Sequence, residues 1–179
     1  TYDLMFDGVQ TRLQIGGFAS LATIIKEKRD EQTIVVNSGE LNGTLYFSLF
    51  KGEPDFLVFN ELGLDGYTLG NHEFDEGDER LAQLIEMAQF PILSSNMMPE
   101  SASPLFRVKD QIKPYVIKEI NGEKIGLIGV LKVEKTKNSS MVSDDVSFIE
   151  EIEAASQAVA ELEAEGVNKI ILVSNVGYY

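Results

Sequence analysis

The sequence predicts an α/β fold with a mixed β-sheet flanked by helices. Short apolar runs with strand character alternate with amphipathic helical segments, and this order is typical of α/β domains. Two apolar runs flank Asn121-Gly122, the preferred pair for a tight hairpin turn, so we expect one antiparallel strand pair within the alternating order. The sequence contains no internal repeat and no interior linker, and we therefore expect residues 1–179 to form a single domain.

Helices are predicted where apolar residues recur at the spacing of one helix face. The last of them is expected to open at the capping box Ser147-Phe148-Ile149-Glu150, and Gly166 follows it as a helix C-terminal glycine. Pro54 suits the first turn of a helix. The predicted helices cover residues 17–29, 44–62 with an interruption at 52–54, a stretch that begins near 78, and 147–165.

Strands are predicted in the short apolar runs between these helices. Residues 132–145 are polar and aperiodic, and we expect them to form a loop. The predicted strands cover residues 33–36, 67–69, 90–95, the two arms of 115–130, and 169–173.

Composition and charge exclude several classes of function. The chain has 29 acidic and 15 basic residues, for a formal net charge of −14, and no basic patch, so nucleic acid and anionic membrane surfaces are not expected partners. No apolar run approaches the roughly 18 residues of a membrane-spanning helix, so membrane insertion is not expected. The chain has no cysteine and one histidine, which excludes thiolate chemistry and any site built from several imidazoles.

Polar side chains gather in loops that follow predicted strands. In open α/β sheets, ligands bind in loops beyond the carboxyl ends of the strands. Three such loops contain Glu40, residues 71–75 and residues 175–177, and Asp3 near the chain start is a fourth candidate. We expect these loops to form the functional site.

The loop Gly70-Asn71-His72-Glu73-Phe74-Asp75 has the most specific chemistry. The Asn71 carbonyl oxygen is a suitable ligand for a hard cation such as Mg, Mn or Ca. His72 could donate to a phosphate oxygen or protonate a leaving group if Asp75, three residues on, orients its ring. The alternative interpretation is a polar loop whose Asn and Asp satisfy the backbone of a turn.

This loop resembles the signature of the 5′-nucleotidase branch of the calcineurin-like metallophosphoesterases. The resemblance continues over nearly the whole chain. Further similar segments are Gly16-Gly17-Phe18-Ala19-Ser20-Leu21-Ala22-Thr23, Ser38-Gly39-Glu40-Leu41-Asn42-Gly43-Thr44, Leu49-Phe50-Lys51-Gly52-Glu53-Pro54, Phe90-Pro91-Ile92-Leu93-Ser94-Ser95-Asn96, Pro114-Tyr115-Val116-Ile117-Lys118 and Ile125-Gly126-Leu127-Ile128-Gly129-Val130.

The resemblance implies an α/β sandwich of mixed β-sheets flanked by helices, with a site for two divalent metals that activate water for attack on a phosphate ester. It implies that residues 1–179 are a single domain of the N-terminal metallophosphatase type, incomplete at both ends. It further implies that the C-terminal substrate-binding domain of the family does not lie within residues 1–179.

The metal-ligand positions depart from the family pattern. The family's first loop reads Asn-Asp-x-His, and here Asp3 keeps the carboxylate while Met5 replaces the imidazole. A thioether is a poor ligand for Mg, Mn or Zn. Glu40 stands where the family has a bridging Asp, Asn71 is kept as a metal ligand, and Asn175 replaces a ligand His. His72 and Asp75 match the catalytic dyad of the family.

Two interpretations follow for function. In the first, the domain is catalytically impaired or inactive because its ligand histidines are replaced or missing, and it serves as a ligand-binding, sensory or interaction module. In the second, it is a divergent metal-dependent phosphoric monoester hydrolase that acts on nucleotides or related phosphate esters. The expected cofactor is one divalent cation (Mn, Mg or Ca) at a depleted site, or no metal.

The resemblance also bears on partners and compartment. It implies a nucleotide or another small phosphate ester as ligand, and a periplasmic or cell-surface location. An open sheet edge at either end of the chain would need a cover, and a second copy in a homo-oligomer could supply one.

Overall fold

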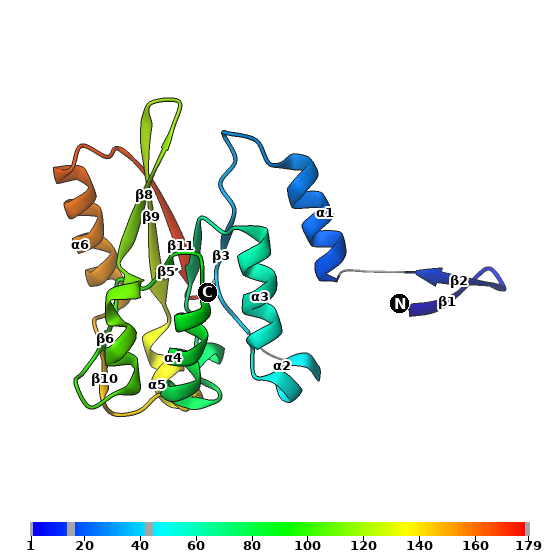
Figure 1. The fold of residues 1–179 in the computed structure, drawn as a ribbon, viewed down its shortest axis with the longest axis horizontal. Coiled ribbons are helices and arrows are strands. Elements are labelled where there is room, and N and C mark those ends of the chain that lie inside the picture. The colour runs from blue at the N-terminus through cyan, green and yellow to red at the C-terminus, as the bar shows by residue number, and fades with distance from the viewer. Residues whose placement is uncertain (1, 14–16, 42–44, 178–179) are drawn as a thin grey trace. The chain divides into compact units, whose positions relative to one another are not determined.

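The computed structural model describes residues 2–13, 17–41 and 45–177. The chain forms two compact units, Thr1–Thr33 and Ile34–Tyr179. The individual elements of each unit can be followed in Figure 1. Among the described residues, no helix combines the length and apolar character that crossing a membrane requires.

The first unit contains a β-hairpin and one helix. Strands β1 (Tyr2–Phe6) and β2 (Val9–Leu13) pair antiparallel, with Asp3 opposite Arg12. Asp7 and Gly8 make the turn with φ angles of 48° and 78°. The predicted first helix is confirmed as α1 (Phe18–Lys28). Asp3 and Met5, which the resemblance aligns with the first metal loop of the family, lie within β1.

The second unit contains a parallel sheet and a mixed sheet, which confirms the predicted mixed α/β fold. The parallel sheet has the order β3-β4-β5-β7, and the mixed sheet has the order β11-β9-β8, with β8 antiparallel and β11 parallel to β9. Thr68 Oγ1 donates to the Val173 carbonyl at 2.8 Å, so β4 and β11 meet where the two sheets adjoin. The bounds are β3 (Val36–Asn37), β4 (Gly66–Thr68), β5 (Ile92–Leu93), β7 (Ile112–Lys113), β8 (Tyr115–Ile120), β9 (Glu123–Leu131) and β11 (Lys169–Asn175).

The helices of this unit lie against both sheets. In Figure 1, α6 follows one side of the β8–β9–β11 sheet, and α3 and α4 lie beside the parallel sheet. The helices are α2 (Leu45–Phe50), α3 (Glu53–Leu62), α4 (Gly77–Met87), α5 (Val133–Ser139) and α6 (Glu151–Ala164), with 3-10 turns η1 (His72–Phe74) and η2 (Pro104–Gln111). The interrupted helix predicted over residues 44–62 is therefore present as α2 and α3, although residues 42–44 lie outside the described residues.

Two predictions of local structure were wrong. Ser147 does not open a helix, because residues Val146–Phe148 form β10, which pairs with β6 (Met97–Pro99). Glu150 is the N-cap of α6, and its carboxylate accepts from the Ile152 N–H at 3.0 Å. The expected loop at 132–145 contains the short helix α5.

Aromatic side chains form the core beneath the candidate site. The rings of Phe56, Phe59, Tyr67 and Phe90 pack with centroid separations of 5.5–6.2 Å. All four side chains are buried. Because aromatic rings bury large areas and interlock in tilted pairs, this cluster holds α3 and β4 in a fixed relation.

A second core lies between α6 and the mixed sheet, and it gives a prediction for stability. Leu162 is fully buried against Ile128 and Val130, and its methyl groups fill the space above Gly126. We expect Leu162→Ala to lower the free energy of unfolding by about 2–5 kcal/mol, because it leaves a cavity. Urea unfolding would measure this.

Ile152→Ala is the matched control, since this side chain is on the same helix and is 76% exposed. It should change stability by less than about 0.5 kcal/mol. Equal losses in the two variants would contradict the assignment of the α6 core face.

Candidate phosphate-binding site

Three loops of the second unit converge at the carboxyl ends of β3, β4 and β11. A Cβ added at Gly39 would lie 2.7 Å from the Gly70 nitrogen, so only glycine permits the first two loops to approach this closely. A Cβ at Gly70 would lie 2.8 Å from Asn175 Nδ2, so glycine is also needed where the β4 and β11 loops meet. The predicted convergence of the loops is therefore present in the fold.

The Glu73 carboxylate links two of these loops to the core. Its Oε1 accepts from the Leu41 N–H at 2.9 Å and from the Tyr67 hydroxyl at 2.6 Å, and its Oε2 accepts from the Gly70 N–H at 2.7 Å. We call these three hydrogen bonds the Glu73 bridge. Tyr67 belongs to the aromatic core, so the bridge fixes both loops relative to packed residues.

Burial changes the acid–base behaviour of this pair. Removal from water raises the pKa of Glu73, although its three hydrogen bonds act in the opposite direction. Burial and the neighbouring Glu73 raise the pKa of Tyr67 well above its usual value, so Tyr67 remains a hydroxyl donor at neutral pH. Sequence reasoning missed Glu73 because its role depends on Leu41, which is 32 residues away in the chain.

His72 and Asp75 form the expected pair. Asp75 Oδ2 lies 2.8 Å from His72 Nδ1, within one turn of the chain around η1. This contact assigns the proton to Nδ1 in the neutral ring and leaves Nε2 as the reactive nitrogen. His72 Nε2 lies 3.5 Å from Glu40 Oε2, so the carboxylate that replaces the family's bridging Asp faces the imidazole.

Glu40 has a strained backbone. Its φ is 77°, in the left-handed region that non-glycine residues seldom adopt, and Gly39 before it has φ 84°. Such strain persists where surrounding contacts fix the chain, and the bond from Leu41 N–H to Glu73 supplies that restraint here. The Glu40 side chain lines the pocket.

Asn71 is buried without a hydrogen-bond partner. Its side chain is fully buried, and neither Oδ1 nor Nδ2 has a partner within the described part of the chain. An unpaired buried amide costs about 1–3 kcal/mol of stability. A residue with this cost is a candidate for a functional role, and a ligand oxygen is the role that the sequence predicts for Asn71.

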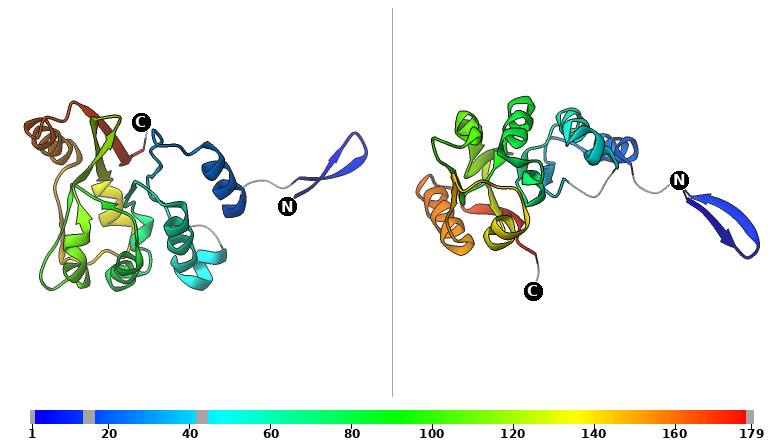
Figure 2. Two further views of the ribbon diagram at one scale, coloured as in Figure 1. Left: turned by 45° about the horizontal axis from the view of Figure 1, so that its top comes forward. Right: turned by 90° about the horizontal axis from the view of Figure 1, so that it is seen from below.

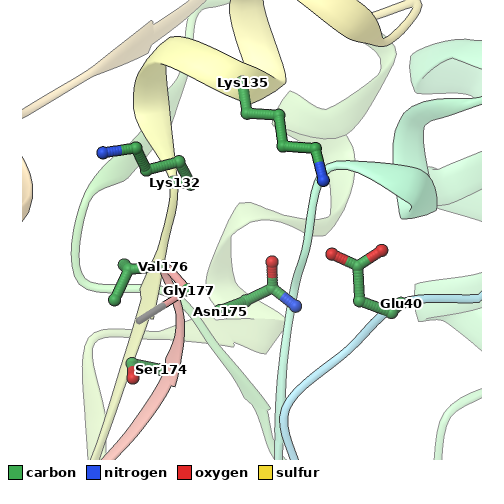
Figure 3. Close-up of a pocket in the computed structure, with 7 residues that line it drawn as sticks. All are labelled: Glu40, Lys132, Lys135, Ser174, Asn175, Val176 and Gly177. Carbon is green, nitrogen blue, oxygen red and sulfur yellow. The ribbon is translucent and has the colours of Figure 1, made fainter. Parts of the chain in front are cut away.

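A pocket of about 350 Å³ opens beside these loops. Figure 3 shows the Glu40 carboxylate and the Asn175 amide on its wall, with Lys135 extending toward the space between them. Asn175 Nδ2 donates to the Ser38 carbonyl at 2.7 Å, which fixes the amide with its Oδ1 turned toward the pocket side. The pocket is lined by Glu40, Lys132, Lys135, Ser174, Asn175, Val176 and Gly177.

The structure brings together most of the predicted site residues. Glu40, His72, Asp75 and Asn175 lie at the convergent loops, and Asn71 is buried beside His72. Asp3 lies in the first unit and is described apart from them. Sequence reasoning missed the pocket lysines because they stand in a segment that was expected to be an irregular loop.

The described residues do not fit the two-metal centre that the resemblance implies. Within the described ranges, no group of three or more histidine, aspartate or glutamate side chains could hold a metal ion. Two carboxylates at the loops are already engaged, Asp75 with His72 and Glu73 in the Glu73 bridge. The oxygen donors that remain are one carboxylate, Glu40, and the amides Asn71 and Asn175. Amide oxygens suit a hard cation, but a single carboxylate does not neutralise two divalent charges.

The Glu73 bridge gives a testable prediction. Glu73→Gln replaces an accepting oxygen with an NH₂ group that faces either the Gly70 N–H or the Leu41 N–H. We expect the free energy of unfolding to fall by about 1–3 kcal/mol, because a buried backbone donor loses its acceptor. Urea unfolding followed by far-UV circular dichroism would measure the change.

Glu163→Gln, at an exposed position on α6, is the matched control and should leave the unfolding midpoint unchanged. An unaltered midpoint for Glu73→Gln would show that the bridge does not stabilise the loops.

Comparisons with known proteins place this site in a family. No family model matches the chain. The chain is 42% identical over 179 residues to a "Probable 5'-nucleotidase" of Treponema pallidum, with 98% of this chain and 30% of the relative covered. The solved Haemophilus influenzae NAD nucleotidase superposes with a TM-score of 0.86 and 40% identity, over 98% of this chain and 35% of the other.

The fold extends to a third solved protein. A calcineurin-like phosphoesterase from Bacillus subtilis superposes with a TM-score of 0.73 and 27% identity, over 95% of this chain and 57% of the other. The chain spans about a third of the length of the first two relatives, 30% and 35%. The chain therefore belongs to the 5′-nucleotidase branch of the calcineurin-like phosphoesterases and is a 5′-nucleotidase-like domain.

Proposed function

We propose that this domain binds nucleotides or related small phosphate esters and is impaired in their hydrolysis. The observation that carries the proposal is a contrast within one site. The His72–Asp75 pair is kept at 2.8 Å, and a pocket lies beside it, yet the described residues contain no group of three acidic or histidine ligands. A site of this kind keeps groups that contact a phosphate ester and lacks the ligands that hold two metals.

The ligand class is inferred from the relatives. The Haemophilus influenzae relative is named an NAD 5′-nucleotidase, and the Treponema pallidum relative a probable 5′-nucleotidase. Their shared substrate chemistry is a nucleoside phosphate. For this chain we infer the same ligand class, with the phosphate toward Asn175 and His72.

The second candidate function is that of a divergent metal-dependent phosphoric monoester hydrolase. Asn71 favours it, because a buried amide without a protein partner is what a metal ligand looks like before its metal is bound. Here one Mn, Mg or Ca ion would be held by Glu40, Asn71 and Asn175. The imidazolium form of His72 would donate its Nε2 proton to the leaving oxygen, with Asp75 accepting from Nδ1–H and holding the ring.

Metal titration separates the two functions. We expect calorimetric titration of the chelator-treated chain with Mn²⁺, and with Mg²⁺ in parallel, to show no binding in the micromolar range. The physical reason is the single carboxylate among the oxygen donors. Metal should also leave the melting temperature unchanged, since only a ligand that binds the native state raises it.

Micromolar binding that Asn71→Ala abolishes would overturn the impaired interpretation and support the hydrolase. Asn138→Ala, at an exposed position on α5, is the control. In that event His72→Ala should abolish release of phosphate from a nucleoside monophosphate.

The unpaired amide gives an independent prediction. Asn71→Ala should not lower the urea midpoint of the metal-free chain, because removal of an unsatisfied buried amide offsets the lost packing. A fall of more than about 2 kcal/mol in the free energy of unfolding would show that Asn71 has a structural role, since a loss of that size is expected when a hydrogen bond to a buried group is broken.

Location and assembly are part of the proposal. We infer an exported protein, periplasmic or at the cell surface, because a solved Thermus thermophilus relative is named a 5′-nucleotidase precursor and superposes at a TM-score of 0.86. A sensory or interaction role for the bound state, and a homo-oligomer, stay predictions.

A further inference from the structure

We propose that Lys135, supported by Lys132, makes the pocket a metal-independent binding site for a phosphate dianion. The ligand is inorganic phosphate or the phosphoryl group of a monoester. This inference deepens the proposed function and rests on its assignment of a phosphate ligand to this pocket. In this inference the positive charge that holds the phosphate comes from an ammonium group rather than from a metal ion.

The charge of the pocket is opposite to that of the chain. The sequence has a formal net charge of −14, yet the pocket lining contains two lysines and a single carboxylate. The lining therefore has a formal charge of about +1 at neutral pH, since lysine is protonated and glutamate ionised. The lining is thus less acidic than the chain as a whole, although Glu151 beside Lys132 offsets part of its positive charge.

The geometry of α5 fixes the lysines there. The Lys132 N–H donates to the Asn175 carbonyl at 3.0 Å, which joins the start of α5 to the end of β11. Thr136 is fully buried, and its hydroxyl donates to the Lys132 carbonyl at 2.7 Å. These two hydrogen bonds hold the start of α5 at the end of β11, and both lysines line the pocket there. The ribbon can be followed in Figure 2.

The two lysines have different roles. In Figure 3 the Lys135 ammonium extends toward the space between Asn175 and Glu40, where an anion would sit. The Lys132 ammonium lies 3.7 Å from Glu151 Oε1, and that carboxylate offsets part of its charge. Because its ammonium points into this space, we take Lys135 as the direct contact, and Lys132 as the source of a weaker field.

The neighbouring polar groups suit a phosphate. An ammonium forms short, charge-assisted hydrogen bonds to phosphate oxygens and acts as a point charge. His72 Nε2 lies 3.5 Å from Glu40 Oε2, so the imidazole faces the one carboxylate in the lining. The pocket volume of about 350 Å³ has room for a phosphoryl group and part of a sugar.

The test is calorimetric titration of the full chain with inorganic phosphate, and separately with a nucleoside monophosphate, in excess chelator. We expect both to bind, and Lys135→Gln to weaken binding at least tenfold. Lys132→Gln should weaken binding less. Lys137→Gln is the matched control, because Lys137 is on the same helix but outside the pocket lining, and it should change affinity less than twofold.

Glu40→Gln distinguishes an ammonium from a metal ion as the group that binds the phosphate. If the ammonium binds the phosphate, removal of the opposing carboxylate strengthens binding in chelator. If Glu40 instead holds a metal, the same change weakens any metal-dependent binding. Unfolding midpoints would confirm that each variant is folded.

The outcomes separate this inference from the proposed function. Phosphate binding in chelator that Lys135→Gln abolishes supports the inference, even where no metal binds. Binding only after Mn²⁺ is added, or equal losses for Lys135→Gln and Lys137→Gln, would overturn it and leave the proposed ligand class standing. No binding of either ligand under both conditions would overturn both. Tighter binding of the monoester than of free phosphate would identify the ester as the ligand.

Discussion

The buried carboxylate of Glu73 is the constraint on which the candidate site depends. It accepts hydrogen bonds from Leu41, Tyr67 and Gly70, and so joins the loop after β3, the aromatic core and the loop after β4. A loop alone has backbone groups that water can satisfy, and its position is then loosely defined. Two loops that share one buried acceptor have a single geometry, because any shift leaves a donor or the carboxylate unpaired.

That rigidity allows other parts of the site to be unfavourable by themselves. Glu40 is held with φ 77°, and Asn71 is buried with an unpaired amide. Each feature costs stability, of the order of 1–3 kcal/mol. Such costs persist only where neighbouring contacts compensate, and here the compensating contacts are the Glu73 bridge and the core beneath Tyr67.

The sequence predicted the order of elements and the loops of the site, because both depend on local patterns. The hairpin at Asn121-Gly122 and the loop at Asn71 could be read from neighbouring residues. The strand at Ser147 could not be predicted in this way. The residues that follow Ser147 match a capping box, whereas its pairing with Met98 in β6 depends on residues far away in the chain. Helix α5 was missed because its seven residues have no apolar periodicity. The hydrogen bond that holds its start, from the Lys132 N–H to the Asn175 carbonyl, joins residues that are far apart in the chain.

An ammonium and a divalent cation supply positive charge with different chemical consequences. Both attract a phosphate dianion. Only the cation also binds a water molecule and lowers its pKa enough to generate hydroxide near neutral pH. A lysine cannot do this, because its proton stays on nitrogen and it has no site for a water ligand. If Lys135 supplies the charge at this pocket, the domain keeps the attraction for phosphate and loses the nucleophile. Binding without turnover then follows from the same substitution of charge, and His72 and Asp75 would remain as a pair that orients the bound ester.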